Sequence, residues 1–319
     1  MGFPAIMAQL RPVLRSPMAR TLYERLLRDR ELQHLDKSQW YHVDLSRIES
    51  GDVRSRFVQC QLDADTQAFL DRSTEKSGWL GTQILHAVVR LFLGWFITKT
   101  SLNGFLGRGS MFVFSRAQFL SLLGLSEDTS GPIFSSLLDI GAGDGNVTAV
   151  LAPYFHRVDV TEVSPPMRRI LQRRGYRVLD AVRLTSESNC ASSAPGVYDV
   201  VCCLNVLDRC DAPLALLRSL RSKLATPSGK LVVAVVVPLS QYVESGQSGT
   251  KPAETLGVSG STLEGQVESL CRDVMEPAGF ALESWTRLPY LCEGDLEQAY
   301  YWLDDVVMVL RAAGDTPSS

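Results

Sequence analysis

A glycine-rich loop directly after a predicted buried strand constrains the fold of this chain more than any other feature. Residues 137–140 read as the end of an apolar strand, and they run into Gly141, Gly143 and Gly145 at alternate positions. Because glycine has no Cβ, such a loop can bend tightly and let a ligand approach the backbone closely. The helix predicted after Gly145 would turn its unpaired N–H groups toward the same ligand. The pattern therefore predicts a strand–loop–helix unit that binds a small molecule.

The spacing of these glycines distinguishes two classes of ligand. In the G-x-G-x-x-G loop of dinucleotide-binding proteins the third glycine falls one residue later than Gly145 does here. The stretch from Asp139 to Gly145 instead resembles motif I of class I S-adenosylmethionine (SAM) methyltransferases, in which the loop holds the amino-acid part of the cofactor.

The second half of the chain alternates strand and helix patterns, which is typical of a parallel sheet with crossover helices. We expect an α/β fold, namely a seven-stranded Rossmann-like class I methyltransferase sheet that ends in a hairpin, with a helical N-terminal extension. Strands are predicted at 133–140, 157–161, 176–179, 198–204, 230–237, 280–288 and 301–310, and helices at 146–154, 165–174, 212–225 and 263–278.

Shifts in composition divide the chain into four parts. We predict a peripheral N-terminal arm (1–50), a helix-rich extension that covers the cofactor site (51–130), the methyltransferase domain (131–311) and a flexible tail (312–319). Two polar stretches interrupt the domain. Residues 183–197 are predicted to be a mobile loop, and the Ser/Gly-rich residues 239–262 a lid or a disordered loop.

Charge and composition narrow the classes of function. A net charge of −3 does not predict a broad nucleic-acid-binding face, so no nucleic-acid partner is expected. The chain has four histidines, and its seven cysteines lack paired metal-site spacing, so no structural metal is predicted. Cys202 and Cys203 fall in an apolar strand pattern and are interpreted as small core residues.

The sequence leaves the compartment open. Residues 79–97 form the most apolar stretch, but His86 and Arg90 interrupt it, so we expect a core-packing or interfacial helix and no stable membrane span. Residues 1–23 contain three arginines and no acidic residue, which is compatible with an organellar presequence. Cytoplasm, endomembranes and mitochondria all remain candidates.

Acidic residues at two strand ends are candidate ligands for the rest of the cofactor. Glu162 lies 23 residues after Asp139, directly behind a predicted strand, where a carboxylate can accept both hydroxyls of a ribose. Asp180 follows the third strand and is a candidate for the adenine amino group; a solvated acid at a strand end is the alternative for both.

The fourth strand ends in a run of polar residues. Ligands of open α/β sheets bind outside the carboxyl ends of the strands, which places Asn205 and Asp208 beside the transferred methyl group. Asp211 is predicted to be the N-cap of the helix at 212–225.

Several further motifs carry a resemblance to one family over residues 55–311. Besides the glycine loop, these are residues 75–79, 107–114, 204–211, 287–295 and 300–305. The chain resembles the DREV, or methyltransferase-like protein nine, family of protein-histidine N-methyltransferases. The resemblance implies transfer of a methyl group from SAM, with S-adenosyl-L-homocysteine as the product. The acceptor would be the ring nitrogen nearer the main chain (pros, N1) in His-x-His motifs with a small central residue, so the implied partners are proteins or peptides that contain this motif.

The resemblance also implies a role for each matching residue. Asn205 and Asp208 would line the place where the imidazole meets the methyl group. Asp208 would accept a hydrogen bond from the second ring nitrogen, and Asn205 would also contact the cofactor. The residues that would bind SAM are Asp139, Gly141, Gly143 and Glu162. Arg108 and Gly109 would close over the cofactor. Tyr290 and Tyr301 would shape the imidazole pocket. A SAM-dependent methyltransferase of small molecules and a non-catalytic SAM-fold interaction module remain as alternatives.

Overall fold

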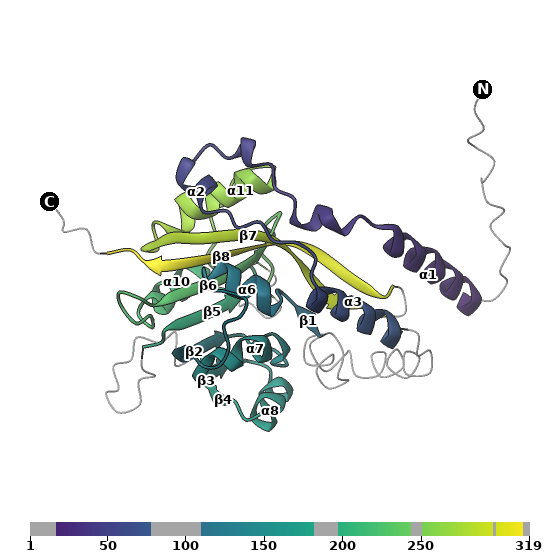
Figure 1. Cartoon of the computed structure of the whole chain (residues 1–319), viewed down its shortest axis with the longest axis horizontal. Coiled ribbons are helices and arrows are strands. Elements are labelled where there is room, and N and C mark those ends of the chain that lie inside the picture. The colour runs from purple at the N-terminus through teal and green to yellow at the C-terminus, as the bar shows by residue number, and fades with distance from the viewer. Residues whose placement is uncertain (1–16, 78–109, 182–196, 244–250, 296–297, 315–319) are drawn as a thin grey trace.

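One curved sheet of eight strands organises the molecule in the computed structural model, which describes residues 17–77, 110–181, 197–243, 251–295 and 298–314 (Figure 1). The strand order is β1-β7-β8-β6-β5-β2-β3-β4. The strands are β1 (Met111–Phe112), β2 (Phe134–Ile140), β3 (Phe155–Thr161), β4 (Arg177–Leu179), β5 (Val200–Leu204), β6 (Lys230–Val236), β7 (Phe280–Glu293) and β8 (Tyr300–Ala312).

Five neighbouring strands are parallel, and their order reverses beside β2. From β2 the chain proceeds to β3 and β4 on one side, whereas β5 and β6 lie on the other side. At such a reversal the connections leave in opposite directions and open a crevice at the carboxyl ends of the strands. The predicted Rossmann-like α/β fold is confirmed, and the strand order reverses where β2 and β5 pair.

Antiparallel strands complete the sheet. β8 pairs with β6 and β7 pairs with β8 along almost its whole length, which confirms the predicted terminal hairpin. The predicted number of seven strands is wrong by one, because β1 pairs with β7 through the Met111–Cys292 and Phe112–Leu291 positions. A strand of two residues is too short to show any period in the sequence.

Helices cover both faces of the sheet. The helix predicted at 146–154 is the shorter α7 (Asn146–Leu151), followed by a 3-10 turn from Ala152 to Tyr154. That at 263–278 is α11 (Leu263–Ser269), which continues as a π-helical turn from Leu270 to Met275. The remaining α-helices are α1 (Pro17–His34), α2 (Gly51–Ser55), α3 (Ala64–Ser77), α6 (Arg116–Leu122), α8 (Pro165–Arg173) and α10 (Pro213–Arg221).

The start of α10 corrects one prediction. Asp211 is not its N-cap, because Ala212 holds that position and makes no side-chain hydrogen bond. The Glu254 carboxylate instead accepts the N–H groups of Leu214 and Ala215. Asp211 in turn accepts the N–H of Ala253. Residues 251–262 are a loop, as predicted, and these contacts fasten it to α10.

Two hydrophobic cores fill the space above and below the sheet. α10 and α11 pack on one face, which we call the α10 face, where Leu217, Val267 and Trp285 are fully buried. α3, α6 and α7 pack on the other, the α7 face, where Phe119 and Leu151 are fully buried. Cys202 and Cys203 point to opposite faces and are both fully buried, which confirms them as core residues.

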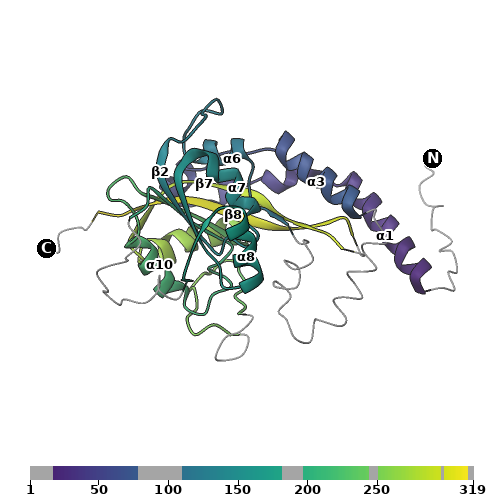
Figure 2. The same cartoon turned by 90° about the horizontal axis from the view of Figure 1, so that it is seen from below.

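The N-terminal region is fastened to the hairpin of β7 and β8. The Trp285 indole donates to the carbonyl of Val53 over 2.7 Å, and the Ser284 hydroxyl donates to that of Leu122 over 2.6 Å. α1 and α3 lie beside the far end of the hairpin in both views (Figures 1 and 2). There the N–H of Ala299 donates to Asp29.

Among the residues that the structure describes, no helix is both long and apolar enough to cross a membrane. The apolar stretch 79–97 and the polar stretch 183–196 lie outside the described residues.

Candidate active site

The glycine loop forms the turn that the sequence predicts. Gly141, Gly143 and Gly145 have φ angles of +70°, +57° and +80°, a left-handed conformation that costs residues with a Cβ about 1–2 kcal/mol each. The neighbouring strand holds the loop, because the N–H of Ala142 donates to the Thr161 carbonyl and that of Gly141 donates to the Thr161 hydroxyl.

Glu162 connects the loop to the end of β3. One carboxylate oxygen accepts the N–H of Gly143 over 3.0 Å, and the other accepts the N–H of Ser164 over 2.8 Å. The side chain is 7% exposed, and a carboxylate has room for further donors on both oxygens. Glu162 therefore lies beside the loop, as predicted, with lone pairs left for the hydroxyl groups of a ligand.

Asp139 is a buried carboxyl beneath the loop. It is 2% exposed and accepts the Thr148 hydroxyl over 2.6 Å. Burial raises the pKa of Asp139 to about 7, and the nearby Glu162 adds to the increase, whereas the bond from Thr148 opposes it. A cation seated beside this carboxyl would restore its charged form.

The loop leaves open the space that a cofactor needs. A Cβ built on Gly143 would meet nothing within 4 Å, whereas one on Gly141 would lie 2.8 Å from Cγ2 of Val206, which follows β5. The loops after β2 and β5 therefore touch at Gly141 and part at Gly143. Glycine backbone, one free cradle and two carboxylates suit SAM, which carries a sulfonium, an ammonium and a ribose.

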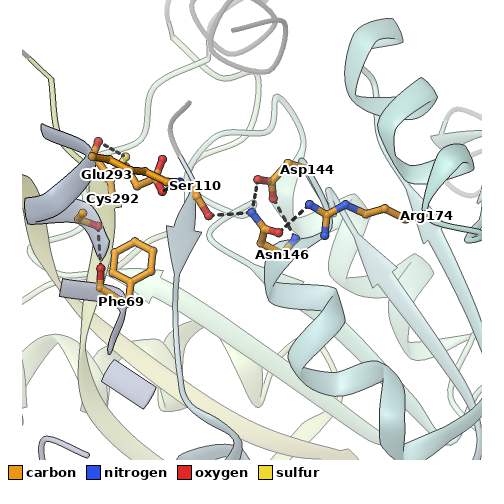
Figure 3. Close-up of polar contacts among 9 residues, drawn as sticks. Phe69, Ser110, Asp144, Asn146, Arg174, Cys292 and Glu293 are labelled. Carbon is orange, nitrogen blue, oxygen red and sulfur yellow. Dashed lines mark hydrogen bonds and ion pairs between the residues drawn. The ribbon is translucent and has the colours of Figure 1, made fainter. Parts of the chain in front are cut away.

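Asn146, the first residue of α7, joins three parts of the site (Figure 3). Its amide nitrogen donates to the Ser110 hydroxyl over 2.7 Å and to Asp144, and its oxygen accepts Arg174 over 2.7 Å. The Ser110 carbonyl accepts the N–H of Glu293. This network connects the segment before β1, the glycine loop and the end of α8.

Three further residues are predicted to bind the cofactor, namely Arg108, Gly109 and Asp180. Arg108 and Gly109 lie outside the described residues, but Ser110, the next residue, contacts the glycine loop through Asn146. Asp180 follows β4 directly, as predicted, and its side chain is exposed.

Asn205 and Asp208 follow β5 on the other side of the crevice. Asn205 adopts a φ of 55°, its N–H donates to the Ala234 carbonyl, and its side-chain amide donates to Asp305 over 2.8 Å. Asp208 is 2% exposed, and one of its oxygens accepts Arg209 over 3.1 Å. Burial raises the pKa of Asp208, and Arg209 opposes the increase.

The two predicted tyrosines come from the terminal hairpin. Tyr290 pairs with Leu303 and Tyr301 with Cys292, so the register puts both side chains on the same face of the hairpin. The Tyr290 hydroxyl lies against the Met111 sulfur, and burial raises its pKa, with Asp305 and Asp208 adding to the increase. The Tyr301 hydroxyl donates to Asp295 over 2.8 Å. Tyr290 therefore belongs to the group around Asp208, whereas Tyr301 is held at the end of the hairpin.

The sequence reasoning missed Asp305. It is fully buried on β8, and burial raises its pKa to about 8, with Asp208 adding to the increase and the bond from Asn205 opposing it. The sequence does carry a signal for it. Asp304 and Asp305 fall within the predicted strand 301–310, directly before its apolar residues 306–310. Acidic residues are almost never fully buried without a reason.

Three oxygens around this group have no hydrogen-bond partner in the part of the chain that the structure describes. They are Oδ1 of Asn205, Oδ1 of Asp208 and Oδ1 of Asp305, and all three are buried. Buried acceptors without donors cost about 1–3 kcal/mol each, so such a group is suited to a ligand that brings donors. Within the same described residues no cluster of metal-binding side chains occurs.

Comparison with known proteins gives one match over most of the chain. A sequence model of the DREV methyltransferase family matches residues 40–312. Two curated proteins are each 26% identical to this chain over 102 residues. They are the ubiquinone biosynthesis O-methyltransferases of Xanthomonas campestris pv. campestris (strain B100) and Xanthomonas euvesicatoria pv. vesicatoria (strain 85-10). These matches cover 31% of this chain and 42% of each relative, so the matched part spans less than half of their length.

Solved structures also resemble the chain. The N-methyltransferase NodS from Bradyrhizobium japonicum WM9, in complex with S-adenosyl-L-homocysteine, is 18% identical with a TM-score of 0.38, covering 62% of this chain and 86% of that one. A TehB-like SAM-dependent methyltransferase from Corynebacterium glutamicum is 15% identical with a TM-score of 0.36, covering 62% and 94%.

Proposed function

This chain belongs to the DREV methyltransferase family, and on that basis we propose that it is a protein-histidine N-methyltransferase. It is a SAM-dependent methyltransferase with a Rossmann-like fold. The proposal concerns its acceptor: the pros nitrogen of a histidine in a His-x-His motif with a small central residue. The observation that carries the proposal is the buried Oδ1 of Asp208, which has no donor among the described residues and lies in the group that contains Asn205 and Tyr290.

SAM supplies an electrophilic methyl group on a sulfonium centre when it is bound. The residues that would hold it are Asp139, Gly141, Gly143 and Glu162, with Asn205 at the methyl end. Glu162 would accept the ribose hydroxyls on the lone pairs that its bonds to Gly143 and Ser164 leave free. Asp139 would face the positive charges of the amino-acid part. Arg108 and Gly109 would close over the cofactor from the segment that ends at Ser110.

The acceptor chemistry follows from imidazole. Its pKa of about 6.5 leaves most of it neutral at pH 7, with a lone pair on one ring nitrogen and a hydrogen on the other. The lone pair forms the new N–C bond as the C–S bond breaks, and the bond electrons leave with sulfur. Because the nucleophile needs no prior deprotonation, catalysis consists mainly of holding the ring in line with the methyl group.

Asp208 would select the nitrogen that reacts. A carboxylate that accepts the N–H of the nitrogen far from the main chain (tele) leaves the pros nitrogen with its lone pair. The methylated ring is an imidazolium, and the same carboxylate stabilises its charge. Burial raises the pKa of Asp208, which also suits it to receive the tele proton when the product becomes neutral.

The two tyrosines would bound the ring. Tyr290 lies near Asp208 and Asp305, which both add to the increase of its pKa, and it would contact the imidazole there. Tyr301 shares that face of the hairpin and would contact the peptide farther out. Exclusion of a bulky central residue would follow from the close approach of the peptide to this hairpin.

The test is transfer of label from methyl-labelled SAM to peptides. A His-Ala-His peptide should become labelled, whereas its Ala-Ala-Ala counterpart should not, and a bulky central residue, as in His-Trp-His, should reduce labelling. Label in both of the first two peptides, or in neither, would refute the histidine proposal. Neither being labelled while SAM binds tightly would favour a small-molecule acceptor or a non-catalytic role.

A further inference from the structure

Asp305 is a buried carboxyl without a counter-ion among the described residues. It lies on β8, opposite Val236 of β6 and Leu288 of β7, and its side chain is fully buried. Its neighbour Asp304 differs, because it is partly exposed and pairs with Arg287 over 2.6 Å. Burying an acid within a sheet is unfavourable, so the presence of Asp305 at this position, bonded by the Asn205 side chain, needs a reason beyond stability.

Asn205 is held at two points. Its backbone N–H bonds to Ala234 of β6, and its φ of 55° is a left-handed conformation that asparagine adopts more readily than most residues with a Cβ. Its side chain reaches past the end of β6 to Asp305 of β8, a hundred residues along the chain. A residue bonded through both its backbone and its side chain presents that side chain in one fixed direction.

The bond to Asp305 decides which end of the Asn205 amide faces the pocket. An amide has two donors on nitrogen and an acceptor on oxygen, at opposite corners of one plane. Since the nitrogen faces Asp305, the oxygen points away from it, and that oxygen is buried without a partner among the described residues. Asp208, three residues later, also presents an unpartnered Oδ1.

We propose that Asp305 is a positioning residue that keeps the Asn205 amide oxygen turned toward the acceptor pocket. Together with Asp208 this gives the pocket two acceptors for the N–H groups of the incoming substrate. If the amide turned over, its NH2 group would face the pocket and repel the N–H of a neutral imidazole. This inference rests on the proposed function, since it assigns the acceptor pocket to a nitrogen heterocycle that donates hydrogen bonds.

An amide in place of the carboxyl should serve in part. Asp305→Asn keeps an accepting oxygen for the Asn205 NH2 group, but its own NH2 group can also donate to the oxygen of a turned amide. Asp305→Asn should therefore hold the Asn205 amide while favouring one orientation less strongly. Asp305→Leu, which keeps the branched shape and is somewhat larger, offers no acceptor and frees the amide to adopt both orientations.

Steady-state transfer to a His-Ala-His peptide separates these variants. We expect kcat of Asp305→Leu to fall at least about tenfold, the loss of one hydrogen bond in the transition state, with Kd for SAM within about threefold. Asp305→Asn, which still offers an acceptor, should keep a kcat between that of Asp305→Leu and that of the natural protein. Asp304→Asn is the matched control and should be unchanged. Equal, large losses in Asp305→Leu and Asp305→Asn, with both folded, would overturn the proposal in favour of proton transfer, and full activity of Asp305→Leu would overturn it outright.

A second readout needs no transfer at all. In nitrogen-15 spectra, the side-chain NH2 signal of Asn205, assigned by its loss in Asn205→Ser, should show one proton protected from exchange in the natural protein and in Asp305→Asn. That protection should disappear in Asp305→Leu, or in Asp305→Ser if the leucine variant does not fold. Unprotected protons in the natural protein would contradict the inference. This result stands even if no histidine peptide is methylated, so failure of the two proposals can be told apart.

Discussion

The backbone N–H of Gly143 donates to the Glu162 carboxylate over 3.0 Å, so the glycine loop after β2 is fastened to the end of β3. This bond joins two parts of the proposed cofactor site that the sequence separates by 19 residues. It also fixes the carboxylate beside the position where the loop lies open.

Glu162→Gln tests this bond. The variant has one NH2 group where Glu162 accepts two backbone N–H groups, so one donor faces another. We expect Kd for SAM to weaken about 10- to 100-fold, measured by calorimetry. Glu127→Gln, at an exposed acid in the segment before β2, is the control and should change Kd by no more than about threefold. Equal Kd values for Glu162→Gln and the natural protein would remove Glu162 from the site.

The affinity for SAM should depend on pH through Asp139. Burial raises the pKa of this carboxyl to about 7 in the ligand-free protein, and a bound cation would lower it, so binding releases a proton below pH 7. We expect Kd to weaken by up to about tenfold per pH unit below pH 7 and to be level above it. Calorimetry in two buffers of different ionisation enthalpy measures the proton release. Asp139→Asn should show neither effect; a pH-dependent Kd in that variant would assign the titration to another group.

Gly141 and Gly143 form a matched pair for the loop. Both have positive φ, but a Cβ on Gly141 would lie 2.8 Å from Val206, whereas one on Gly143 would meet nothing. We expect Gly143→Ala to lose about 1–2 kcal/mol of unfolding free energy and Gly141→Ala more, measured by denaturant unfolding. Adding Val206→Ala should restore part of the unfolding free energy that Gly141→Ala loses, but none of the loss in Gly143→Ala. Gly143→Ala should nevertheless bind SAM more weakly, because its methyl group enters the open cradle; unchanged binding would place the cofactor elsewhere.

Asp208→Asn separates cofactor binding from transfer. In the proposed site the carboxylate contacts the acceptor and not the cofactor, so the variant should bind SAM within about twofold of the natural Kd. Its kcat on a His-Ala-His peptide should fall at least about a hundredfold, because an amide neither stabilises the imidazolium nor accepts its proton. Loss of SAM binding in this variant would make Asp208 a structural residue.

Much of the fold could be predicted because its signals are local. β5 and β6 are short apolar runs, β2 ends in one, and β3 ends in alternating apolar residues; the glycines and Glu162 lie directly after β2 and β3. Contacts between residues far apart in the sequence, in contrast, leave no local pattern. Glu254 caps α10 from 40 positions away, a role that the local pattern assigns to Asp211.

Asp305 was missed for the same reason. Nothing in its neighbourhood separates it from Asp304, and only the pairing of β8 with both β6 and β7 buries one carboxyl and exposes the other. Asn205 was found from its place at a strand end, but the direction of its amide depends on Asp305. Reasoning from position in the sequence therefore reached the residues that follow strands, whereas Tyr290 and Tyr301, inside strands, came only from the family resemblance and Asp305 was missed.

The most direct test of the account is the identity of the methylated amino acid. A His-Ala-His peptide incubated with the protein and methyl-labelled SAM is hydrolysed in acid, and its amino acids are separated by chromatography against both methylhistidine isomers. The account predicts that the label elutes with pros-methylhistidine. Label in tele-methylhistidine, or in no form of histidine, would contradict it.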